Sequence, residues 1–113
     1  MFEKIFYRTL IKEKIETLAS WIYEADRKTW VYGYTDLLKL DLRDTLSEIK
    51  CETLIIGASF PNKEVAQENF EKQYEKLHNK VIKMASNSKH FIMYDQPEWF
   101  YNTLNNFLAN ERK

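Results

Sequence analysis

The first part of the chain carries apolar side chains at helical spacing. Between residues 2 and 22 they recur every three or four positions, and charged side chains occupy positions between them. Residues 24–39 follow a similar pattern, although Gly33 and the aromatic residues around it weaken the helical prediction. The pattern predicts two helices with a broad aromatic face, which together form a helical region over residues 1–40.

A different pattern begins at Asp41. Residues 41–46 favour a turn or a short helix, and residues 53–57 then form a continuous apolar run that ends at Gly57. Such a run is typical of a parallel strand that is buried on both faces. A second short strand is expected at residues 80–85, followed by a polar loop at residues 86–89.

One helix is expected after each of these strands. The first spans residues 63–77, and its apolar face is formed by Ala66, Phe70, Tyr74 and Leu77. Residues 41–113 are therefore predicted to form a strand–helix–strand–helix segment. The fold class is α/β, in which the helical region 1–40 precedes a segment of a parallel sheet.

The last helix has a recognisable beginning. Asp95 is the predicted N-cap, because Glu98 follows three residues later as in a capping box. Pro97 falls in the first turn, where its missing N–H is tolerated. The expected buried stripe of this helix consists of Phe100, Leu104, Phe107 and Leu108.

Composition limits the partners that the chain attracts. Its 113 residues are enough for one compact domain. Lys and Arg number 17, as do Asp and Glu, so no net charge draws the chain to nucleic acid or to an acidic membrane. The many aromatic residues are a large apolar load for a small core, which favours a surface that binds a partner.

Cysteine usage and the N-terminal sequence indicate a compartment. The single cysteine, Cys51, cannot form an internal disulfide, which favours a reducing environment. The N-terminus is amphipathic, so we expect neither a secretory signal nor a membrane span, and we expect a cytoplasmic protein. One cysteine and two distant histidines lack the spacing of a metal site, and no Gly-rich phosphate loop is present, so no metal or cofactor is expected.

Two stretches resemble the C-terminal part of an α/β-hydrolase-fold enzyme. Residues 41–57 resemble the approach to the penultimate strand, although many members have a proline where this chain has Glu52. Residues 88–100, SKHFIMYDQPEWF, are similar to the closing motif of the family. In that motif a loop histidine is followed by apolar residues, an acidic residue, a proline and the final helix. The helical region 1–40 resembles, more weakly, the cap that covers the active site.

The resemblance places His90 at the position of the catalytic histidine. In this family that histidine is the general base, which activates a serine, aspartate or cysteine nucleophile. A pKa near neutrality lets a histidine take a proton and return it. The alternative is an ordinary loop histidine that caps the last helix or pairs with a carboxylate.

The rest of the family's catalytic triad has no clear match. The nucleophile lies in a Gly-x-Ser-x-Gly elbow, and neither Gly33 nor Gly57 belongs to one. Ser59 follows the first strand and is expected to be a turn residue. Glu64 is the carboxylate nearest to the family's acid position, and the simpler interpretation is a first-turn helix residue; the acid could also lie on an earlier strand. His78 is expected to be solvated near a helix end.

The resemblance implies a hydrolase that acts on a small, apolar, ester-like substrate, with this chain supplying the general base. Because the elbow is missing, the chain alone is expected to be inactive. The alternative is a non-catalytic module that dimerises or binds a small ligand. Two parallel strands leave both outer edges unpaired, so we expect a partner, either a second copy or the N-terminal part of the hydrolase. The alternative is a monomer in which the N-terminal helices fold back and cover the sheet. Three tryptophans raise the prospect of a ligand cage, although packing is the simpler interpretation: Trp21, Trp30 and Trp99.

Overall fold

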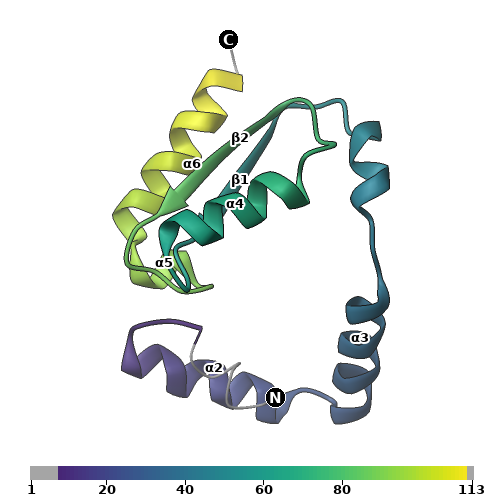
Figure 1. Cartoon of the computed structure of the whole chain (residues 1–113). Coiled ribbons are helices and arrows are strands. Elements are labelled where there is room, and N and C mark those ends of the chain that lie inside the picture. Colours follow the sequence, from purple (N-terminus) through teal and green to yellow (C-terminus); the bar gives the residue numbers. More distant parts are fainter. Residues whose placement is uncertain (1–7, 112–113) are drawn as a thin grey trace.

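The computed structural model describes residues 8–111, which form a mixed α/β structure (Figure 1). Strands β1 (Thr53–Ala58) and β2 (Lys80–Ala85) are parallel and are joined by helix α4 (Lys63–Gln73). The strands pair without a bulge from Thr53–Lys80 to Ala58–Ala85. The other elements are α2 (Lys12–Glu24), α3 (Arg27–Lys39), the 3-10 helix η1 (Arg43–Glu48), α5 (Ile92–Asp95) and α6 (Pro97–Glu111).

Helix α4 covers one face of the two-stranded sheet (Figure 1). Ile55 and Gly57 are buried in β1, whereas the residues between and beside them are only half-buried. A Cβ atom at Gly57 would lie 2.7 Å from both the Phe70 ring of α4 and Met84 Sδ of β2. The missing side chain at position 57 therefore lets α4 pack closely on the sheet, and this explains why a glycine ends the apolar run.

The core is small and lies between the sheet and the helices that follow its strands. Its buried apolar members in these elements and their connections are Ile55, Ala66, Leu77, Ala85 and Ile92. The stripe predicted for α6 is only partly buried, because Phe100, Leu104 and Phe107 keep intermediate exposure and Leu108 is 46% exposed. The prediction that Leu108 is buried was therefore wrong.

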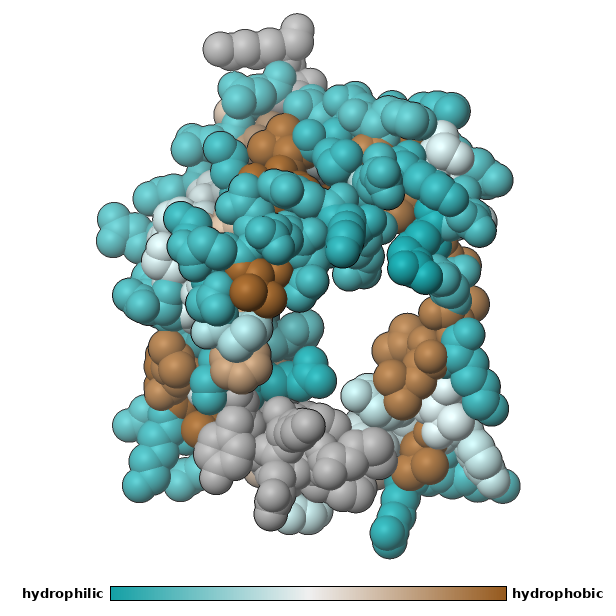
Figure 2. All heavy atoms as spheres, viewed as in Figure 1, coloured by the Kyte–Doolittle hydropathy of each residue, from teal (hydrophilic) through white to brown (hydrophobic). Residues whose placement is uncertain are grey.

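Helices α2 and α3 form an arm that stands away from the sheet. Figure 1 shows the chain running from α2 through α3 and η1 before it returns to β1. Figure 2 shows an opening through the molecule between this arm and the sheet, with hydrophobic residues gathered along it on the α3 side. Tyr32, Leu37 and Leu38 of α3 are each more than 60% exposed. The arm therefore leaves much of its apolar surface uncovered.

Several predicted helix boundaries differ from the structure, and the helix predicted over residues 24–39 begins at Arg27. The helix expected over residues 2–22 begins only at Lys12, because residues 8–11 are held in a non-helical conformation; residues 1–7 lie outside the described part of the chain. The helix expected over residues 63–77 ends at Gln73, where a turn follows and Leu77 becomes buried in the connection to β2. Asp95 is not an N-cap, because it lies at the end of α5, and α6 begins after it at Pro97.

The remaining elements follow the predicted pattern. The second helix of the N-terminal region and both strands are present, and the short helix after Asp41 is a 3-10 helix. Asp41 accepts hydrogen bonds from the backbone N–H and the guanidinium of Arg43, which lower the pKa of Asp41 to about 2. No helix within residues 8–111 is long and apolar enough to cross a membrane.

Candidate functional site

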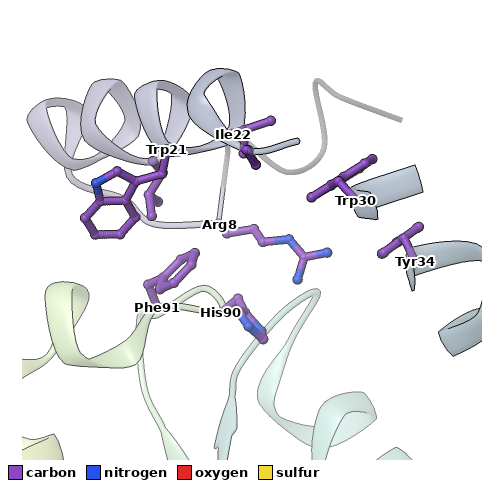
Figure 3. Close-up of a pocket in the computed structure, with 9 residues that line it drawn as sticks. Arg8, Trp21, Ile22, Trp30, Tyr34, His90 and Phe91 are labelled. Carbon is purple, nitrogen blue, oxygen red and sulfur yellow. The ribbon is translucent and has the colours of Figure 1, made fainter. Parts of the chain in front are cut away.

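An apolar cavity of about 330 Å³ lies between the arm and the loop that follows β2 (Figure 3). Its volume is within the range of small-molecule sites. Helix α2 contributes Leu18, Trp21 and Ile22 to its wall. Helix α3 contributes Trp30 and Tyr34, whose rings stack with centroids 5.4 Å apart. The wall is therefore mainly apolar and largely aromatic. Most of it comes from the two N-terminal helices, and the loop after β2 completes it.

His90 lies on the loop between β2 and α5, at the carboxyl edge of the sheet, and lines this cavity. Its position on a cavity-lining loop agrees with the prediction, except that α5 separates it from the last helix. The ring meets Phe91 edge to face, with centroids 5.2 Å apart. Within residues 8–111 the imidazole has neither a hydrogen-bond nor an ion-pair partner, so here His90 is not a helix cap or half of a carboxylate pair.

The environment of His90 favours its neutral form. Partial burial of the ring lowers the pKa of His90 below its ordinary value, and the positive charge of Arg8 lowers it further. A neutral imidazole has a free lone pair at neutral pH, which is what a general base needs. The ring is also exposed enough to be reached by solvent or by a bound molecule.

Arg8 is the charged residue of the cavity. Figure 3 shows its side chain extending between α2 and the His90–Phe91 loop, with the guanidinium on the side of Trp30 and Tyr34. Its backbone carbonyl accepts a hydrogen bond from Phe91 N at 2.8 Å, which holds the residue beside the loop. No carboxylate of the described chain forms an ion pair with Arg8.

Asp95 connects the segment that carries Arg8 to the loop that carries His90. Its Oδ1 atom accepts hydrogen bonds from the Thr9 hydroxyl at 2.5 Å and from Leu10 N at 2.7 Å. Its Oδ2 atom accepts one from Lys89 N at 2.8 Å. Asp95 therefore links the segment next to Arg8 to the residue next to His90 through hydrogen bonds to one carboxylate.

The other residues weighed as triad members do not join the cavity wall. Ser59 follows β1 in an irregular connection rather than in the predicted turn, and its Oγ accepts a hydrogen bond from Ser88 N at 3.4 Å. Glu64 lies in the first turn of α4 and is exposed. His78 lies in the connection before β2, at the opposite edge of the sheet from His90, and is exposed. Within the described residues no group of acidic, histidine and cysteine side chains could hold a metal ion.

Sequence reasoning found His90 but missed two residues of this site. Arg8 fell within a predicted helix, where an arginine is expected to face water. Asp95 was predicted to cap the last helix. Its actual partners, at residues 9 and 10, lie more than eighty positions away, and a local sequence pattern does not show contacts over that separation. Trp21 and Trp30 line the cavity, whereas Trp99 belongs to α6 and is not part of the wall.

Comparison with known proteins adds no relative. No protein-family model, curated protein or solved structure matches the chain.

Proposed function

We propose that this chain is the C-terminal part of an α/β-hydrolase-fold enzyme, in which His90 is the general base for hydrolysis of a small, apolar, ester-like substrate. The observation that carries the proposal is the position of His90. It follows the second of two parallel strands, on a loop at the carboxyl edge of the sheet, and it lines an aromatic cavity. Ligands of open α/β sheets bind at this edge, outside the carboxyl ends of the strands.

The electrostatics of the cavity support the same role. A general base works from its unprotonated form, and both burial and the Arg8 charge lower the pKa of His90. The apolar wall would accept an acyl chain or a ring. In the proposed enzyme α2 and α3 are the cap over the active site, and their aromatic residues contact the substrate.

The uncovered apolar surface of the arm supports the proposal that a further polypeptide segment completes the fold. A monomer with exposed apolar residues along an opening has surface that a further set of strands and helices would bury. The two-stranded sheet needs such a partner as well, since each strand has one edge that no other strand of the described chain occupies. The N-terminal part of a hydrolase would supply the remaining strands, the nucleophile and the oxyanion hole.

Fragment complementation tests the proposal. The coding sequence directly upstream is expected to encode a Gly-x-Ser-x-Gly elbow. That upstream segment, co-expressed as a separate polypeptide with this chain, is expected to hydrolyse a p-nitrophenyl ester. His90→Ala in this chain should reduce the rate to background, as should replacement of the elbow serine by alanine.

His78→Ala is the matched control, because His78 is the other histidine of the chain and lies at the far edge of the sheet. It should leave the reconstituted rate within twofold. An upstream sequence without an elbow, or a rate that survives His90→Ala, would contradict the proposal.

One observation favours a second candidate, a non-catalytic module that dimerises. The exposed apolar residues of α3 form a surface that a second copy could bury, and this function needs no nucleophile. The upstream sequence separates the two candidates, because a dimerising module needs no elbow.

A further inference from the structure

Among the described residues, the cavity combines one cationic side chain with a wall that is otherwise apolar or neutral. Of the described residues that line it, Arg8 alone carries a full charge at neutral pH, while Trp21, Trp30 and Phe91 contribute aromatic rings. A guanidinium beside an apolar wall loses part of its hydration, and that loss is normally compensated by a carboxylate or another acceptor. No carboxylate of residues 8–111 provides that compensation.

The position of Arg8 is imposed by the fold. The backbone hydrogen bond from Phe91 N to Arg8 O and the bonds of the next two residues to Asp95 fix its main chain. The neighbouring side chain, Thr9, is 1% exposed and therefore cannot move without opening the structure. The main chain of Arg8 is thus anchored beside the cavity, and its side chain extends along the cavity toward Trp30 and Tyr34, in reach of a molecule bound there (Figure 3).

From this geometry we infer that the cavity binds a small molecule made of an aromatic or branched apolar body and one carboxylate. The apolar body lies between the helices of the arm and the His90–Phe91 loop, and the carboxylate accepts a bidentate pair of hydrogen bonds from Arg8. A phosphate monoester is a poorer fit. A dianion is normally held by several cationic or backbone donors, and within residues 8–111 a single guanidinium lines the cavity.

The inference deepens the proposed function and rests on it for the chemistry. In the hydrolase, the carboxylate is a recognition group of the substrate, separate from the ester carbonyl that is attacked near His90. The binding itself needs no catalysis. It is therefore measured on this chain alone, so a failure of complementation and a failure of binding remain distinguishable.

The experiment titrates the full chain with the anion of 2-naphthylacetic acid (a free carboxylate, not an ester) and with its neutral isostere 2-naphthylacetamide. Calorimetry and the fluorescence of the tryptophans measure binding. The carboxylate is expected to bind about tenfold or more tightly than the amide, since a charge-assisted pair adds at least that much. Acetate, which lacks the apolar body, and inorganic phosphate are expected not to compete. Equal binding of the acid and the amide, competition by phosphate, or no binding of either naphthyl compound would each overturn the inference.

Variants locate the site. Arg8→Gln should weaken the binding of the 2-naphthylacetic acid anion about tenfold and leave the affinity for the amide unchanged. Arg8→Lys should recover part of the lost affinity. Arg27→Gln is the matched control, because Arg27 begins α3 and lies outside the cavity wall. Binding of the carboxylate should also raise the pKa of His90 in an NMR titration, because it neutralises the nearby positive charge. An effect of Arg27→Gln equal to that of Arg8→Gln would show that the carboxylate is held elsewhere.

Discussion

The carboxylate of Asp95 and the hydroxyl of Thr9 form a 2.5 Å hydrogen bond between residues 86 positions apart. Because Thr9 is buried and Asp95 also binds Leu10 N and Lys89 N, this contact fixes both sides of the candidate site. Asp95→Ala removes all three acceptor contacts. It should lower the free energy of unfolding by roughly 2 kcal/mol, the order expected for hydrogen bonds to a charged group. Urea denaturation measures the loss.

Asp36→Ala is the control for this substitution, because Asp36 is exposed on α3. It should change the free energy of unfolding by no more than about 0.5 kcal/mol. Equal effects of the two alanine variants would show that the hydrogen bonds of Asp95 do not stabilise the fold.

His90 should titrate below the ordinary histidine pKa. Burial is the larger cause and the Arg8 charge the smaller, so Arg8→Gln should raise the pKa of His90 without fully restoring it. The unfolded chain takes up this proton first as the pH falls below about 6.5. Stability is therefore lost as the pH falls through that value toward the folded pKa. NMR of the ring protons, assigned with His90→Ala, follows the titration; a pKa above the ordinary value would contradict the arrangement.

The two glycines should respond in opposite ways to alanine. At position 57 the new methyl group would meet Phe70 and Met84 at 2.7 Å, so Gly57→Ala should destabilise the chain by about 1–3 kcal/mol. Gly33 lies within α3 with nothing within 4 Å of the added Cβ, so Gly33→Ala should stabilise it by about 0.5–1 kcal/mol. Thermal melts of the pair measure both changes. A neutral Gly57→Ala would show that α4 lies farther from the sheet.

The isolated chain should not hydrolyse a p-nitrophenyl ester above the buffer rate. His90 has no hydroxyl, thiol or carboxylate hydrogen-bonded to it within residues 8–111, and a general base alone has no nucleophile to activate. The assay compares the chain with His90→Ala and Ser59→Ala at equal concentration. Activity that disappears in both variants would identify an unforeseen nucleophile.

The chain should self-associate at micromolar concentration. Leu37 and Leu38 of α3 are 61% and 69% exposed, and the sheet has open edges within the described structure. A double substitution of these two leucines by glutamate should shift the chain toward monomer in light scattering, because a charge cannot be buried unpaired in an interface. A parent chain that has a monomer mass of 13.7 kDa, unchanged by dilution and without binding of a hydrophobic dye, would defeat this prediction.

Local sequence pattern predicted the elements well but not their ends or their long-range contacts. The apolar run of β1 depends on neighbouring residues, and such a signal is readable along the chain. The conformation of residues 8–11 depends on Asp95, which competes for backbone groups that a helix would otherwise use. Likewise, the motif around His90 predicted its loop, whereas the presence of Arg8 in the cavity follows from tertiary structure alone.

The hydrogen bonds of Asp95 also bear on the order in which parts of the molecule unfold locally. The segment before α2 and the first turn of α2 meet the rest of the described chain through this carboxylate, the hydrogen bond from Phe91 N to Arg8 O and the contact of Lys14 with the Tyr94 ring. The strands, in contrast, share a continuous ladder and the buried face under α4. Sub-global opening that frees the arm therefore requires less free energy than unfolding of the sheet. Amide protons of α2 and α3 are therefore expected to exchange faster with solvent than those of the two strands.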